Sequence, residues 1–124
     1  MTEHFSNRWE EHAKTVSEPA ERAKKEGIRR ITCGPAIAEY DLACLPDGRT
    51  AIRIQCRVES SSGMTIPWRA FPTRDEAIDF FRREVVAFFK REGKLTKDRE
   101  AARKKIMGIL EPNNLFGFAE PEPA

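Results

Sequence analysis

Hydrophobic and polar residues alternate along the middle of this chain as they do in β-strands that have one buried face. The clearest run is residues 50–59, where Ile52 to Val58 are apolar at every second position and the intervening residues are polar. The connections Leu45-Pro46-Asp47-Gly48 and Ser60–Gly63 have the composition of tight turns. The three runs are residues 37–45, 50–59 and 64–71. This pattern predicts a three-stranded antiparallel meander.

The two turns also predict how the strands pair. If Leu45 pairs with Arg49, and Ser60 pairs with Met64, every inward-facing pair is apolar. These pairs are Leu42–Ile52, Tyr40–Ile54, Ala38–Cys56, Val58–Ile66, Cys56–Trp68 and Ile54–Ala70. A shift by one residue turns every side chain of a strand to the opposite face, so the agreement favours this register. Because Pro67 has no N–H to donate, we expect the third strand at an edge of the sheet.

Helical patterns precede the meander. Apolar residues at helical spacing predict a first short helix around residues 9–16. Pro19 is tolerated in the first turn of a helix, so a second helix is expected from there to about Glu26, with Gly27 just beyond its end. We therefore expect N-terminal helices before the sheet.

Two further helices are expected after the meander. Thr73 and Glu76 form a capping box, which predicts a helix from about Arg74 to Glu92. Its apolar residues fall within about 120° of the helix surface, as in a helix that covers a sheet. They are Ala77, Ile78, Phe81, Val85, Phe88 and Phe89. Phe80 and Val86 lie outside this stripe, where we expect contact with the N-terminal helices or a partner. A last, basic helix is expected from Lys97 to Leu110.

These elements predict one α+β domain over residues 1–112, in the order α-α-β-β-β-α-α, and a partly disordered tail over residues 113–124. The length of 124 residues fits a single domain. No run approaches the roughly 20 apolar residues that a membrane span needs. The first eight residues are polar, unlike a secretory signal, so we expect a cytoplasmic protein without a membrane partner.

Charge is unevenly distributed along the chain. Residues 82–105 contain ten Lys or Arg and four Asp or Glu, whereas residues 111–124 contain three Glu and no base. Basic helices of this kind neutralise phosphates, and such binding is independent of sequence and sensitive to salt. The candidate residues are Arg82, Arg83, Lys90, Arg91, Lys94, Lys97, Arg103, Lys104 and Lys105. They predict a small non-catalytic accessory or regulatory protein that contacts nucleic acid or a nucleoprotein complex.

An alternative is a protein-interaction module, either an adaptor or an inhibitor of a partner protein. Aromatic residues near an edge strand and in a tail are typical of protein interfaces. The candidate interface residues are Phe71, Phe80, Leu115, Phe116 and Phe118. The segment Leu115–Phe118 can instead fold back onto its own core.

The polar face of the meander is a further nucleic-acid candidate. It carries Arg53, Gln55, Arg57 and Arg69, which are side chains able to read bases. In the predicted register Asp41 faces Arg53 and Glu39 faces Gln55. Cross-strand charge pairing is therefore the simpler expectation for this face.

Catalysis has little support in the sequence, and we expect a protein without enzymatic activity. His4 and His12 are eight residues apart, so they do not form a helical metal pair. The cysteines are Cys33, Cys44 and Cys56, an odd number without a CxxC motif. We expect reduced thiols and no metal, cofactor or small-molecule substrate. A minor enzymatic hypothesis centres on His12, Cys33 and Tyr40.

Overall fold

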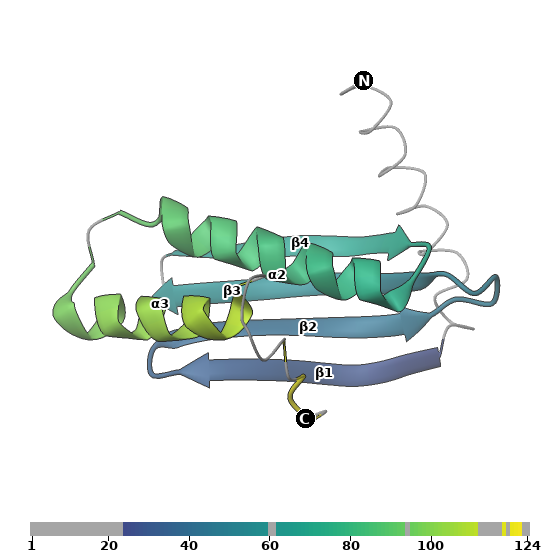
Figure 1. Cartoon of the computed structure of the whole chain (residues 1–124), viewed down its shortest axis with the longest axis horizontal. Helices are drawn as coiled ribbons and strands as arrows, with labels where there is room; N and C mark the ends of the chain where they lie inside the picture. The colour runs from purple at the N-terminus through teal and green to yellow at the C-terminus, as the bar shows by residue number, and fades with distance from the viewer. Residues whose placement is uncertain (1–23, 60–61, 94, 112–117, 119, 123–124) are drawn as a thin grey trace, which may run out of the picture.

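A computed structural model describes residues 24–59, 62–93, 95–111, 118 and 120–122. The strands are β1 (Lys24–Cys33), β2 (Ala36–Cys44), β3 (Thr50–Glu59) and β4 (Ser62–Phe71), and the helices are α2 (Arg74–Arg91) and α3 (Lys97–Leu110). The four strands form one antiparallel sheet in chain order. Both helices lie on the same face of this sheet (Figure 1).

The expected second N-terminal helix and the three-stranded sheet are both wrong. Lys24–Cys33 is a strand that pairs with β2, and a two-residue turn connects the two strands. Gly27, at φ +98°, lies at a register shift in this strand and not beyond a helix end. Ile31 and Cys33 are buried at alternate positions of this strand. Pairing with β2 begins at Lys24, so it overrides the helical propensity expected up to Glu26. The first predicted helix lies outside the described residues.

The predicted pairing of β2 with β3 is confirmed. The backbone N–H of Leu45 donates to the carbonyl of Arg49 at 2.9 Å, and Gly48 adopts φ +92° in the turn between the strands. The observed inward pairs are Leu42–Ile52, Tyr40–Ile54 and Ala38–Cys56. All six side chains are buried, so this hairpin provides the central part of the inner face.

The predicted pairing of β3 with β4 is wrong. The observed pairs include Ile54–Ile66, Cys56–Met64 and Ala51–Ala70. The connection between the strands is shorter than expected, because Glu59 already pairs with Ser62, so the register differs from its first pair onward. A bulge adds a further shift, since Pro67 and Trp68 together stand opposite the single residue Arg53. This bulge turns Trp68 to the outer face, where the Arg53 guanidinium lies 5.3 Å from its ring centroid. β4 is an edge strand, as the proline predicts.

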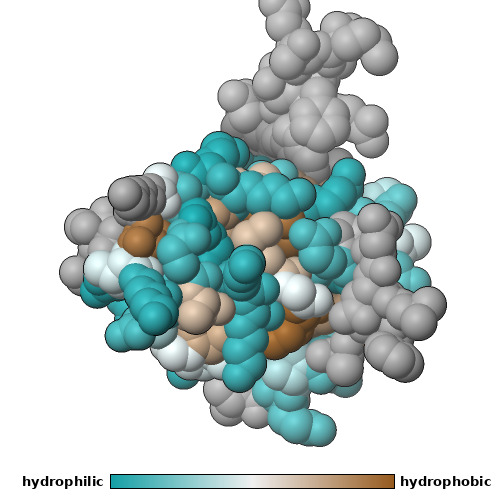
Figure 2. Space-filling view, turned by 60° about the vertical axis from the view of Figure 1, so that its left-hand side comes forward, coloured by the Kyte–Doolittle hydropathy of each residue, from teal (hydrophilic) through white to brown (hydrophobic). Residues whose placement is uncertain are grey.

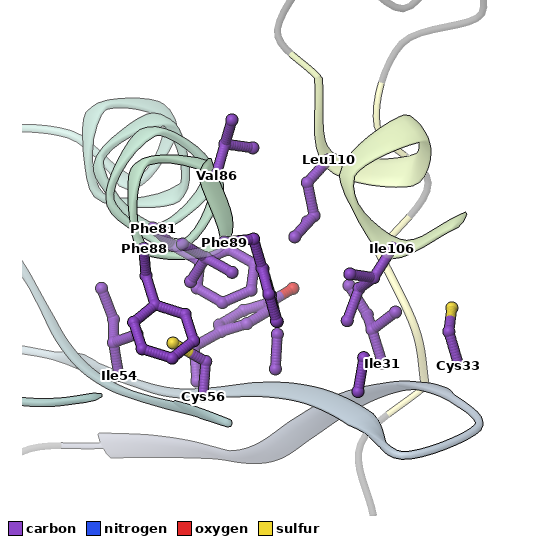
Figure 3. Close-up of a cluster of buried hydrophobic side chains, with 14 of the residues drawn as sticks. Ile31, Cys33, Ile54, Cys56, Phe81, Val86, Phe88, Phe89, Ile106 and Leu110 are labelled. Atoms are coloured by element: carbon purple, nitrogen blue, oxygen red, sulfur yellow. The ribbon is translucent and has the colours of Figure 1, made fainter. Parts of the chain in front are cut away.

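Both predicted C-terminal helices are confirmed. The Thr73 hydroxyl accepts a hydrogen bond from the Glu76 backbone N–H at 3.2 Å and so caps α2. The entire predicted apolar stripe of α2 is buried. Val86 is also buried, because α3 lies beside it; Figure 3 shows Val86 and Leu110 in the space between the two helices. Phe80 stacks against Phe71, with ring centroids 4.9 Å apart.

The main hydrophobic core lies between the inner face of the sheet and the two helices (Figure 3). Tyr40 and Phe81 are at its centre, with ring centroids 4.4 Å apart. Ile106 and Leu110 bring α3 onto β1 and β2, while Phe88 and Phe89 bring α2 onto β3. A second, smaller cluster on the other face contains Ala43, Leu45, Ala51 and Ala70, with Trp68 packed against them.

Replacing Ile106 by Ala should lower the free energy of unfolding by about 2–5 kcal/mol, because this side chain is fully buried between α3 and the sheet. Ile109→Ala is the matched control, since Ile109 is 36% exposed on the same helix. That change should cost less than about 0.5 kcal/mol. Urea unfolding of both variants measures the difference. Equal losses would contradict the described packing of α3.

Candidate nucleic-acid interface

Two of the predicted phosphate-binding arginines are engaged in holding the helices together. Arg82 of α2 donates from Nε to the Leu110 carbonyl at 3.0 Å and from Nη2 to the Glu111 carbonyl, so it caps the end of α3. Arg103 of α3 donates from Nη1 to the Glu92 carbonyl at 2.7 Å, and it also forms an ion pair with Glu100. Each arginine therefore satisfies carbonyls at the C-terminal end of the other helix, where positive charge is favoured. We call this arrangement the reciprocal arginine caps.

A third predicted residue, Arg83, is paired within its own helix. Its Nε lies 3.0 Å from Asp79 Oδ2 one turn earlier. Both side chains are about half exposed or more, so the pair contributes little to stability. It nevertheless neutralises one of the charges on the outer surface of α2.

Five predicted residues remain as exposed cations, and we call them the helix-end basic surface. They are Lys90, Arg91, Lys97, Lys104 and Lys105. Within the described part of the chain, none of them forms an ion pair with an acidic side chain. Lys94, the remaining candidate, lies outside the described residues.

Lys90 and Arg91 lie at the end of α2 and Lys97 lies at the start of α3, and these two helix ends face the same side of the molecule (Figure 1). Lys104 and Lys105 lie about two turns further along α3. At about 100° per residue, Lys97 and Lys104 share one side of α3, opposite the buried Ile106. Lys90 lies on the corresponding outer side of α2. The small residue Ala101 lies between Lys97 and Lys104 on this side of α3. Figure 2 shows polar side chains over most of the visible surface, with separate hydrophobic areas between them.

The outer face of the sheet is largely charge-paired, as its sequence predicts. Arg53 Nη2 lies 3.3 Å from Asp41 Oδ2, and Arg30 Nη2 lies 3.1 Å from Glu39 Oε2. Arg69, expected on this face, instead pairs with Ile52, because the bulge shifts the register of β4. A shallow depression on this face is lined by Ile37, Glu39, Gln55, Arg57, Gly63 and Thr65, among others. Because both Glu39 and Arg57 line this depression, its charge does not favour phosphate binding.

Two partly buried carboxylates form a charge network that sequence analysis missed. Arg74 Nη2 lies 2.9 Å from Glu26 Oε1, and Arg74 Nη1 lies 2.6 Å from Glu120 Oε2. Tyr40 donates its hydroxyl to Glu120 Oε1 at 2.9 Å, and Arg29 Nη2 reaches Glu26 at 3.4 Å. The network joins β1, β2, α2 and the C-terminal segment. No local spacing pattern connects positions so far apart in the chain.

The predicted protein-interface residues are placed differently from one another. Phe71 and Phe80 stack on each other and pack against the main core. Phe118 lies with its ring centroid 6.3 Å from that of Phe81 and beneath the Arg82 guanidinium, 5.1 Å away. Leu115 and Phe116 lie outside the described residues.

The residues of the minor enzymatic hypothesis do not come together among the described residues. Cys33 pairs with Ala36 and Tyr40 pairs with Arg29, so four positions along β2 separate them. Burial raises the pKa of the Cys33 thiol, against the opposing charge of Lys105. His12 lies outside the described residues. The described part of the chain contains no group of three or more His, Cys, Asp or Glu that is arranged to hold a metal ion.

Comparisons with protein-family models, with curated proteins and with solved structures give no match for this chain. Within the described residues, neither helix has the length and hydrophobicity that crossing a bilayer requires.

The carboxylate network makes stability depend on pH in a defined direction. Hydrogen bonds from Arg74 lower the pKa of both Glu26 and Glu120 below the ordinary value of 4.5. A lowered folded-state pKa means that the pairs stabilise the fold above pH 4.5, and that this contribution is lost as the pH falls through the lowered value. The free energy of unfolding of the wild type should therefore exceed that of Glu120→Gln most at neutral pH, and this difference should shrink below about pH 4.5. Urea unfolding between pH 7 and pH 3 measures it. A difference that stays constant with pH would rule out this account. Glu122→Gln is the control, because this glutamate is exposed.

The three thiols should react at very different rates. Cys44 is exposed, whereas Cys33 and Cys56 are buried, and burial raises the pKa of Cys56 to about 12. In the folded protein at pH 8, a chromogenic disulfide reagent should titrate one thiol quickly and the other two only after denaturation. Cys44→Ser should abolish the fast phase. A fast phase of two or three thiols would show that the core opens readily.

Proposed function

We propose that this protein binds nucleic acid, free or within a nucleoprotein complex, through the helix-end basic surface, as a non-catalytic accessory protein. The supporting observation is that five exposed cations from the end of α2 to the middle of α3 have no acidic partner in the described residues. Arg82 and Arg103 of the same segment are engaged in helix caps, and Arg83 is engaged in a surface pair. The surplus positive charge therefore lies between Lys90 and Lys105.

The chemistry of this surface suits phosphates better than bases. All five cations carry either an ammonium or a guanidinium on a long exposed side chain. The charge of Lys105 also acts on the Cys33 thiol, so this lysine lies on the side of α3 nearer β1. An ammonium group attracts phosphate oxygens as a point charge, and a guanidinium can donate two parallel hydrogen bonds to them. Neither contact depends on the base sequence. Ala101 and Gly108 leave room for a backbone to approach α3 closely. We therefore propose binding that depends little on base sequence, in the cytoplasm, where the free cysteines stay reduced.

Binding to a generic duplex should weaken steeply with salt. Contacts from three to five cations correspond to a slope of about −3 to −4.5 in a plot of log Kobs against log salt concentration. The double change Lys97→Gln/Lys104→Gln should lower the magnitude of the slope by about 2 and weaken binding at low salt. Fluorescence anisotropy with a labelled duplex of about 20 base pairs measures both quantities.

Arg83→Gln is the matched control, because Arg83 lies on the same outer surface of α2 as Lys90 but is paired with Asp79. It should change the slope much less than Lys90→Gln does. Absence of binding at low ionic strength would overturn the proposed function. Equal effects of Arg83→Gln and Lys90→Gln would show that general charge, and not this surface, is responsible.

The alternative function, an adaptor or inhibitor of a partner protein, has weaker support. Phe71, Phe80 and Phe118 all make aromatic contacts inside the protein, so less of their surface is available to a partner. Protein binding through the edge strand β4, or through Leu115 and Phe116 outside the described residues, stays a prediction.

A further inference from the structure

The C-terminal segment is held on the protein by contacts that resemble the capture of a short peptide. The Glu120 carboxylate accepts two hydrogen bonds from Arg74, at 2.6 and 2.9 Å, so the pairing is bidentate. The Tyr40 hydroxyl donates a third hydrogen bond to this carboxylate, at 2.9 Å. One carboxylate is thus fixed by groups from β2 and α2.

Two further contacts lie on either side of Glu120. The carbonyl of Pro121 accepts a hydrogen bond from Arg29 Nη1 at 2.9 Å. On the other side, Phe118 packs against Phe81 and lies under the Arg82 guanidinium. The segment therefore has an aromatic anchor, a carboxylate anchor and a backbone anchor within four residues. We call the receiving groups, Arg29, Tyr40, Arg74, Phe81 and Arg82, the tail cradle.

The charges of the tail cradle require an anion. Arg29 and Arg74 both contact Glu26, at 3.4 and 2.9 Å, so two guanidiniums share one carboxylate of the sheet. Without Glu120 this cluster has an excess of one positive charge, and the Tyr40 hydroxyl loses its acceptor. Both arginine side chains are partly buried, which makes an unbalanced charge more costly than at an open surface. A second carboxylate therefore stabilises the cluster, and Glu120 supplies it.

The receiving groups and the occupant differ in how they are attached to the fold. Every member of the tail cradle lies on a strand or helix that packs in the main core. The occupant follows α3 near the end of the chain, after Leu110, and belongs to no strand of the sheet. Its exchange for another peptide therefore breaks no strand pairing and no helix.

We infer that the tail cradle is a binding site for an acidic peptide of a partner protein, with an aromatic residue two positions before a glutamate that is followed by proline. The chain's own Phe118–Pro121 segment occupies this site in cis and competes with the partner. A short tether gives the tail an effective concentration on the order of millimolar, so a free peptide binds appreciably only when it outcompetes the tail or when the tail is released. This inference is independent of the proposed function, because the tail cradle contains no residue of the helix-end basic surface.

The test uses the full-length Glu120→Gln protein and a fluorescent peptide with the sequence of residues 115–124. The substitution removes the charged anchor of the tail, so the labelled peptide should bind saturably and at least about tenfold more tightly than it binds the wild-type protein. Fluorescence anisotropy measures both affinities. No binding to the Glu120→Gln protein at millimolar concentration would overturn the inference.

Two matched peptides make the test specific for the carboxylate. A peptide with Gln in place of the residue that corresponds to Glu120 should bind at least about tenfold more weakly, because it loses charge-assisted hydrogen bonds. A peptide with Gln in place of Glu122 loses the same charge but should bind within about twofold, since Glu122 is exposed. Equal affinities of the two peptides would overturn the inference, because general electrostatic attraction would then explain the binding.

Substitutions in the tail cradle itself test where the peptide binds. Tyr40→Phe in the Glu120→Gln background keeps the ring that packs on Phe81 and removes only the hydroxyl. It should weaken peptide binding about five- to tenfold while the thermal unfolding midpoint changes little. Arg74→Gln in the same background should abolish binding. Unchanged affinity in both variants would place the peptide elsewhere and reject the tail cradle as its site.

Discussion

The inner face of the β2–β3 hairpin is the surface on which the rest of this protein depends. Six apolar side chains from the two strands lie on that face and are buried. At roughly 25 cal/mol per Å² of apolar area, leaving such a surface in water costs more than a small domain can tolerate. The α2 and α3 helices cover it, and β1 and β4 extend it on either side. The helices are therefore held by the sheet, and the positions of their charges follow from how they pack on it.

The same type of residue has different roles in this helix layer because of where the packing places it. Arg82 and Arg103 point between the two helices and meet backbone carbonyls at helix ends, where a fixed positive charge is stabilising. Lys97 and Lys104 point away from the sheet and meet no acidic side chain of the described residues. A count of basic residues along the segment does not distinguish these roles, whereas the helix orientation does. Which of these positive charges stay without an acidic partner is thus a property of the fold.

The glutamates also have different roles that depend on where the fold places them. Glu26 and Glu120 come from β1 and from the C-terminal segment, yet both contact Arg74 at the start of α2. The acidic composition of the last residues suggests only a polar tail. The structure shows one glutamate engaged by three groups and the other, Glu122, exposed. Glu120 contacts Tyr40 and Arg74, which lie far from it in the sequence, so only the tertiary structure distinguishes the two glutamates.

Features set by neighbours in the chain were predictable from the sequence. The β2–β3 register follows from a tight turn and strict alternation, and α2 begins at its capping box, because both depend on contacts within a few residues. The bounds of α3 follow in the same way from its helical spacing. Features that need a distant contact were decided only by the tertiary structure. Lys24–Cys33 is a strand because β2 offers an edge to pair with, and the bulge at Pro67 moves Trp68 to the other face. Local propensities differ by less than about 1 kcal/mol per residue, so burial against a distant strand, or an ion pair with a distant residue such as Glu120, outweighs them.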